Sequence, residues 1–113
     1  MNKLVKLFIT SISAITLALV SFTSSFAKVE GEYIVLGSAI SLTGKYSSNG
    51  VHTQNGYNMA VDRINKMGGV EVQGKKYKFE IIYYDDESNP KRAAQLAERL
   101  IKQDGVHYML GPY

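Results

Sequence analysis

Hydrophobic and polar positions fall into blocks that predict alternating strands and helices. Tyr33 to Ile40 (YIVLGSAI) is an apolar run rich in β-formers, which is typical of a strand buried on both faces. Tyr77 to Tyr84 (YKFEIIYY) predicts a second strand, and Val106 to Leu110 (VHYML) predicts a short third one. Ahead of the second strand, Val70 to Lys76 indicates a short hairpin that turns at Gly74.

Two helices are expected between these strands. Ser41 to Gly50 has the composition of a turn, and a helix follows it as far as Met67, where two glycines end it. Its buried positions are expected three and four residues apart, at Gly56, Met59, Ala60, Ile64 and Met67. The second helix begins near Pro90, after an acidic segment with an N-cap candidate, and ends at Gly105. Its apolar stripe is expected at Ala93, Leu96, Ala97, Leu100 and Ile101.

Two consecutive β-α-β units predict a parallel sheet, and the need to cover both faces predicts its strand order. Right-handed crossovers in the order 1-2-3 would place both helices on one face and leave the other face in water. The order 2-1-3 places them on opposite faces, so the expected fold class is α/β with a doubly wound parallel sheet. Ligands are then expected at the switch point between the first and third strands, lined by Ser41 to Asn49 and by Gly111, Pro112 and Tyr113.

Residues 1–27 have the composition of a cleavable signal peptide. Lys3 and Lys6 provide a basic start. The run from Leu7 to Phe22 is mostly apolar but shorter than the ~20 residues of a membrane-spanning helix, and Ser25-Phe26-Ala27 resembles a cleavage site. The alternative is an uncleaved membrane anchor. We expect cleavage after Ala27, which would leave residues 28–113 as a mature protein in the periplasm.

Charge and cysteine content exclude several functions. The net charge is +3, but two of the thirteen basic residues lie in the signal peptide, so the mature part carries only +1. This balance gives no support to a nucleic-acid or anionic-membrane partner. Because the sequence has no cysteine, it offers no disulfide, thiol nucleophile, cysteine-ligated metal site or lipid attachment point. A freely soluble periplasmic protein that is not embedded in the membrane is the simplest expectation.

Candidate catalytic and metal-binding patterns are weak. Asp85, Asp86 and Glu87 look like metal ligands, but they follow the second strand and lie outside the switch point. Carboxylates in the first turn of a helix favour its dipole by ~0.3 to 1 kcal/mol each, which is reason enough for their presence. His52 and His107 fall on different elements without the partners of a nucleophilic triad. We therefore expect no catalytic residues, no metal and no cofactor, and a protein that is not an enzyme.

Candidate ligand contacts lie in the first loop and at the end of the chain. Ser48 and Asn49, with backbone N–H groups at the start of the helix behind them, could meet a carboxylate or another polar group of a ligand. Tyr46 and Tyr113 would provide flat walls. The alternatives are that Ser48 and Asn49 only cap the helix and that both tyrosines pack against protein.

The order and spacing of four segments carry a resemblance to a known family. They are SLTG from Ser41 to Gly44, GYNMAVDRINKMGGV from Gly56 to Val70, YYDDESNPKRAAQLAERLI from Tyr83 to Ile101, and QDGVHYMLGPY to the end. Together they resemble the branched-chain amino acid (leucine-binding type) periplasmic binding proteins of ABC transporters. The resemblance implies a type I periplasmic binding protein, in which two hinged α/β lobes close on a ligand. Residues 28–113 would then be an incomplete N-terminal lobe.

The resemblance also implies a function. It predicts the solute-binding component of an ABC importer, a monomer that captures an amino acid or similar small polar solute and delivers it to a membrane permease. Relatives often carry an aromatic residue at the position of Asn49, so the amide here could suit a more polar ligand. The alternatives are a type I binding protein for urea, amides or aromatic acids, a ligand-sensing domain, and an exported α/β enzyme with catalytic groups at the strand ends.

Overall fold

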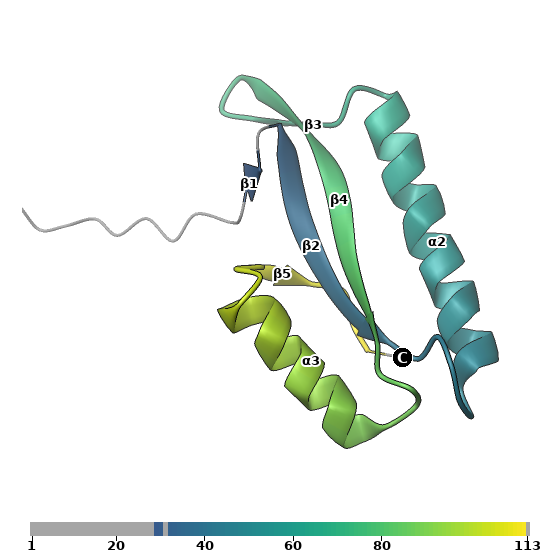
Figure 1. Cartoon of the computed structure of the whole chain (residues 1–113). Coiled ribbons are helices and arrows are strands. Elements are labelled where there is room, and N and C mark those ends of the chain that lie inside the picture. The colour runs from purple at the N-terminus through teal and green to yellow at the C-terminus, as the bar shows by residue number, and fades with distance from the viewer. Residues whose placement is uncertain (1–28, 31, 113) are drawn as a thin grey trace, which may run out of the picture.

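The computed structural model describes residues 29–30 and 32–112. The predicted signal peptide, its cleavage site and Tyr113 lie outside the described residues. Figure 1 shows the order of the elements. They are β1 (Val29–Glu30), β2 (Tyr33–Ile40), α2 (Ser47–Lys66), β3 (Val70–Val72), β4 (Lys75–Asp85), α3 (Pro90–Lys102) and β5 (Tyr108–Met109).

The parallel part of the sheet has the predicted order. β2 lies between β4 and β5 and is parallel to both, so the strands follow the order 2-1-3 expected for a doubly wound sheet. Two antiparallel pairs extend it. β3 pairs with β4 through the predicted hairpin, whose turn residues Gln73 and Gly74 have φ of 51° and 78°, as a two-residue type I′ turn requires. β1, which the sequence pattern did not predict, pairs with the start of β2, so the whole sheet is mixed.

The two helices cover opposite faces of the sheet, as Figure 1 shows. On one face Tyr83 of β4 donates a hydrogen bond from its hydroxyl to Asn58 of α2 (2.9 Å). On the other face the neighbouring residue Tyr84 donates to Asp104, just beyond α3 (3.0 Å). Because successive side chains of a strand point to opposite faces, these contacts place α2 and α3 on either side.

Asn65 of α2 continues the hydrogen bonding along the outer edge of β4. Its side-chain amide donates to the carbonyl of Phe79 and its side-chain oxygen accepts from the Phe79 N–H, both at 2.8 Å. The pairing of β3 with β4 extends only to Tyr77, so the Asn65 side chain takes the next outward-facing position. The adjacent Lys78 N–H points the other way, to the Glu32 carbonyl (2.9 Å).

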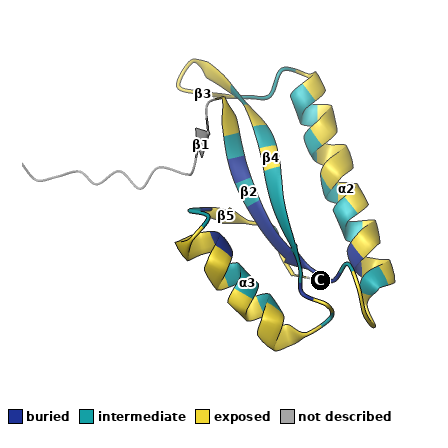
Figure 2. Ribbon diagram, viewed as in Figure 1, coloured by how far each residue is buried: buried dark blue, intermediate teal, exposed yellow. Residues whose placement is uncertain are grey.

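The described core is small and lies along the second half of β2, where Figure 2 shows the longest buried stretch. One cluster on the α3 face joins β2 to α3 and to the segment before β5. Its buried members are Val35, Ala39, Leu100 and Val106, with Ile82, Tyr84 and Leu96 packed against it. The α3 stripe is thereby confirmed at Leu96 and Leu100, but Ile101 is 54% exposed and its predicted burial is wrong.

Helix α2 differs from its prediction in both start and orientation. It begins at Ser47 instead of after Gly50, and its N-cap residue Tyr46 makes no side-chain capping bond within the described chain. Gly50 is buried against the end of β2, whereas Met59 and Met67 of the predicted stripe are 73% and 66% exposed. A side chain at position 50 would place Cβ 1.7 Å from the Ser41 carbonyl oxygen, so the close approach of Gly50 to Ser41 orients the helix.

We expect this approach to make Gly50→Ala destabilising by about 3 kcal/mol, because the new methyl group overlaps backbone that cannot give way. Gly56→Ala is the matched control in the same helix, since nothing lies within 4 Å of its Cβ position. There alanine should stabilise the helix by about 0.5 to 1 kcal/mol. Urea denaturation of the protein expressed from its full reading frame measures both effects, and equal effects of the two substitutions would contradict the proposed packing.

Ser38 provides a second test of the core. Its side chain is fully buried, and its hydroxyl oxygen has no hydrogen-bond partner among the residues that the structure describes. A buried polar group without a partner costs about 1 to 3 kcal/mol. Ser38→Ala should therefore raise the free energy of unfolding by about 1 kcal/mol. A decrease, measured in the same urea titration, would mean that the hydroxyl is hydrogen-bonded in solution.

Candidate ligand-binding site

The candidate site lies at the carboxyl ends of β2 and β5, where the sheet has its switch point. From β2 the chain runs into the loop before α2, and from β5 it runs into Leu110, Gly111 and Pro112. The Leu110 N–H donates to the Gly37 carbonyl (2.8 Å), which continues the pairing of β5 with β2 beyond the strand itself. The crossover from β2 to β4 runs through α2 on one face, and the crossover from β4 to β5 runs through α3 on the other face, so neither helix closes the edge between β2 and β5.

A hollow of about 540 Å³ opens beside this edge on the α3 face. Small and apolar side chains of α3 and of the segment after β5 form most of its wall, and polar groups of the two loops lie along it. The lining residues are Ala39, Ser41, Tyr46, Asp86, Ser88, Asn89, Pro90, Ala93, Ala94, Ala97, Met109, Leu110, Gly111 and Pro112. The hollow therefore combines an apolar wall with a few polar groups, as small-molecule sites do.

Of the predicted ligand contacts that the structure describes, one lines the hollow and two do not. Tyr46 is 42% exposed and lines the hollow, and the Lys45 ammonium lies 5.0 Å from the centre of its ring. Ser48 and Asn49 are exposed in the first turn of α2 and are not part of the hollow's lining. Neither is the N-cap residue, so the capping alternative for them is wrong. The structure thus brings Tyr46 to the hollow and leaves Ser48 and Asn49 on the neighbouring helix start.

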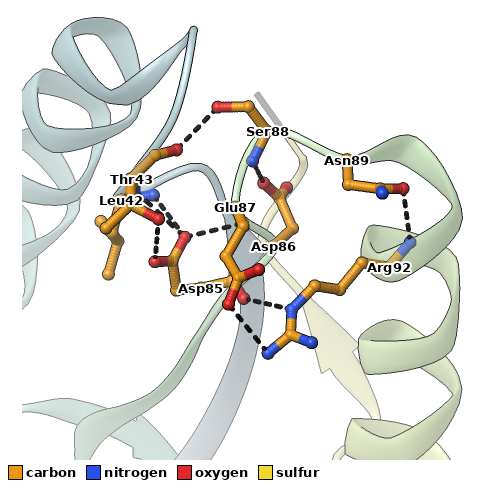
Figure 3. Close-up of polar contacts among 8 residues, drawn as sticks. All are labelled: Leu42, Thr43, Asp85, Asp86, Glu87, Ser88, Asn89 and Arg92. Atoms are coloured by element: carbon orange, nitrogen blue, oxygen red, sulfur yellow. Dashed lines mark hydrogen bonds and ion pairs between the residues drawn. The ribbon is translucent and has the colours of Figure 1, made fainter.

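A carboxylate binds the start of the loop between β2 and α2, as Figure 3 shows at Leu42 and Thr43. Asp85 is the last residue of β4, and the strand register places it beside Ile40, the last residue of β2. Its carboxylate accepts hydrogen bonds from the N–H groups of Leu42 (2.9 Å) and Thr43 (3.2 Å). It also accepts from the Thr43 hydroxyl (2.7 Å) and from the Glu87 N–H (2.8 Å). One side chain thereby joins the loops that follow β2 and β4.

Asp86 and Ser88 add further links between the same two loops. The buried Asp86 carboxylate accepts from the Ser41 hydroxyl (2.6 Å) and from the Ser88 N–H (2.8 Å). The Ser88 hydroxyl donates to the Thr43 carbonyl (2.7 Å) and accepts from the Tyr46 N–H (2.9 Å). We call Asp85, Asp86 and Ser88 together the loop clamp.

The acidic segment therefore has another role than the one predicted for it. Asp85, Asp86 and Glu87 all precede the N-cap residue Asn89, so they lie outside the first turn of α3 and do not act as its dipole partners. Asn89 caps the helix itself, by accepting from the N–H groups of Lys91 (2.9 Å) and Arg92 (3.2 Å). In sequence, the signal for the clamp is a pair of acidic residues, Asp85 and Asp86, at the end of one strand, together with the hydroxyl residues Ser41 and Thr43 after the end of the neighbouring parallel strand.

The environment of Asp85 changes its pKa. Burial acts to raise the pKa, but the hydrogen bonds from the Thr43 hydroxyl and from the N–H groups of Glu87, Leu42 and Thr43 favour the charged form and lower it overall. The clamp is thus built on an ionised carboxylate.

Among the described residues, no group of three or more His, Asp or Glu side chains could hold a metal ion, and no helix is long and apolar enough to cross a membrane.

Comparison with known proteins identifies the family. The doubly wound sheet with its switch-point edge defines a class of α/β binding folds. The periplasmic binding protein family model matches residues 34–113, so the chain belongs to the periplasmic binding protein family. The Leu/Ile/Val-binding protein BraC3 of Rhizobium johnstonii is 34% identical over 88 residues, which are 78% of this chain and 23% of that protein. The chain thus spans about a quarter of this relative's length.

Solved structures agree with this assignment. The branched-chain amino acid transporter substrate binding protein LivJ of Streptococcus pneumoniae, in complex with isoleucine, has a TM-score of 0.61 and 31% identity over 69% of this chain and 21% of its own. A solute binding protein of an ABC transporter from Rhodopseudomonas palustris, in complex with 3,4-dihydroxybenzoic acid, has a TM-score of 0.55 and 31% identity over 69% of this chain and 20% of its own. The predicted resemblance and fold class, a type I periplasmic binding protein, are thereby confirmed.

The pKa of Asp85 predicts how stability depends on pH. Because the folded-state pKa is lowered, the stabilisation from Asp85 is complete above the ordinary aspartate pKa of about 4 and is lost as the pH falls through the lower folded-state value. We expect the difference in unfolding free energy between the wild type and Asp85→Asn to be constant down to about pH 5 and to shrink below about pH 4. Urea denaturation across this range measures it.

Glu87→Gln is the matched control for this prediction. The Glu87 carboxylate lies 3.4 Å from the Arg92 guanidinium in a pair whose side chains are both about half exposed, so its removal should have little effect at any pH. A difference between wild type and Asp85→Asn that stays constant to about pH 3 would show that the clamp does not depend on the ionised form.

Proposed function

We propose that this chain forms the first part of the N-terminal lobe of an extracytoplasmic solute-binding protein that serves an ABC importer. In this proposal the protein binds an amino acid or similar small polar solute in a cleft between two lobes and delivers it to a membrane permease. The match of the periplasmic binding protein model to residues 34–113 carries the proposal. Two relatives, a Leu/Ile/Val-binding protein and a branched-chain amino acid transporter component, support the ligand class.

The proposed ligand contacts are Tyr46, Ser48, Asn49 and Tyr113. Tyr46 would offer its ring at the edge of the switch point, and Ser48 and Asn49 would offer polar groups from the first turn of α2. Residues 1–27 would direct export and be removed after Ala27, which places the mature protein in the periplasm. A monomer is proposed, with the permease as its protein partner.

The proposed mechanism is closure of two lobes around the solute. Contacts that the ligand makes to both lobes would offset the cost of bending the hinge, so a bridging ligand shifts the population toward the closed form. The transporter would then recognise the closed form. Such a protein releases its ligand unchanged, which separates it from an enzyme.

A second ligand class has a specific observation in its favour. The Rhodopseudomonas palustris structure, at the same 31% identity as LivJ, was solved with 3,4-dihydroxybenzoic acid. Asn49 also presents an amide instead of an apolar surface at the start of α2. A protein that binds aromatic acids, urea or amides is therefore the alternative proposal.

A thermal-shift screen tests both proposals. The protein expressed from its full reading frame is heated with each of the twenty amino acids, with 3,4-dihydroxybenzoic acid and with urea. A ligand at 100 times its Kd should stabilise the folded state by about 2.7 kcal/mol, which raises the melting temperature by several degrees. Stabilisation by any amino acid supports the first proposal, and stabilisation by the aromatic acid or urea alone supports the second. If none of these compounds raises the melting temperature, both proposals fail.

A further inference from the structure

We infer that Asp85 is a positioning residue for the ligand site: its carboxylate holds the loop from Leu42 to Tyr46 in the shape that presents Tyr46 to the solute. The inference rests on the proposed function, because Tyr46 is one of the proposed ligand contacts. Asp85 itself does not line the hollow, so it would act on the ligand only through the loop.

The contacts of Asp85 are concentrated on this loop. Three of the four hydrogen bonds that its carboxylate accepts come from Leu42 and Thr43, more than forty residues earlier in the chain. Oδ1 accepts the two backbone N–H groups, and Oδ2 accepts the Thr43 hydroxyl, so both carboxylate oxygens are used. A loop whose successive N–H groups bond to one side chain has little freedom to change its course.

Ser88 links the part of the loop that Asp85 holds to Tyr46. The Ser88 hydroxyl bridges the Thr43 carbonyl and the Tyr46 N–H, so the two ends of the loop are fixed to the same residue. Gly44, with φ of 81°, lies so close that a Cβ there would be 2.8 Å from both the Glu87 carbonyl and the Ser88 hydroxyl. The loop before α2 and the loop before α3 thus pack without space between them.

The conformation of the loop before α3 also depends on the loop clamp. Glu87 and Ser88 have φ of 54° and 61°, in the left-handed region that non-glycine residues seldom occupy. The Glu87 N–H donates to Asp85 and the Ser88 N–H donates to Asp86, and these bonds stabilise both unfavourable conformations. Removing the Asp85 carboxylate would therefore release the first loop directly and also weaken the turn that presents Ser88.

Ligand affinity in matched variants tests the inference. The probe is L-leucine, titrated by calorimetry into the full-reading-frame protein. Asp85→Ala should weaken binding at least ~10-fold, because the loop must be ordered at the expense of binding energy. Asp85→Asn should stay within ~3-fold of wild type, since an amide oxygen can still accept the two backbone N–H groups and its NH2 can donate to the Thr43 hydroxyl. Glu87→Ala, which loses only an exposed pair with Arg92, should stay within ~2-fold.

Two further measurements keep the test decisive. Hydrogen exchange of the Leu42 and Thr43 amides needs no ligand, and Asp85→Ala should accelerate it at least ~10-fold relative to wild type. If Asp85→Ala does not fold, Thr43→Val removes only the hydroxyl bond and should weaken leucine binding, while Thr43→Ser should restore it.

The outcomes separate the inference from the proposed function. Unchanged amide exchange in Asp85→Ala overturns the inference, as does leucine affinity that stays within ~2-fold in a folded Asp85→Ala or falls equally in Glu87→Ala. If the wild type does not bind leucine, leucine is not its solute, and amide exchange alone then decides whether Asp85 positions the loop.

Discussion

The Asp85 carboxylate joins the two loops at the carboxyl edge of the sheet, and the shape of that edge depends on this link. The parallel pairing of β2 with β4 ends with Ile40 beside Asp85, so the loops that follow both strands begin side by side. Without a polar side chain between them, the N–H groups of Leu42 and Thr43 would have only water as a partner. With it, the start of α2 and the start of α3 become parts of one rigid surface.

The pairing of the strands and their order could be predicted from the sequence because both follow from general constraints. Buried parallel strands are continuous apolar runs, and covering both faces of the sheet requires the second crossover to reverse direction, as it does in the order β4-β2-β5. The orientation of α2 could not be predicted in this way. It depends on the contact between Gly50 and the Ser41 carbonyl, and the pattern of hydrophobic positions does not indicate which glycine packs against backbone. The result is a helix whose methionines lie in water.

The switch point was predicted from the sequence, but the loop clamp beside it was not, and Ser48 and Asn49 do not line the hollow. The switch point between β2 and β5 and the position of Tyr46 beside the hollow follow from the topology. The clamp needs distances that sequence does not supply, because Asp85 and Thr43 meet only when the strand ends are in register. Composition pointed instead to the helix dipole, a local explanation, whereas three of the four hydrogen bonds to the Asp85 carboxylate, and the Ser41 bond to Asp86, come from residues more than forty positions away along the chain.

The side-chain amide of Asn65 has a consequence for how this sheet meets other molecules. By bonding to both backbone groups of Phe79, it occupies the outer edge of β4 at the point where β3 stops. An unpaired stretch of edge strand is a template on which a second polypeptide can add itself as a further strand. At this position a second chain could pair only by displacing a side chain that makes two hydrogen bonds and belongs to a twenty-residue helix. Asn65 therefore opposes edge-to-edge strand pairing at Phe79.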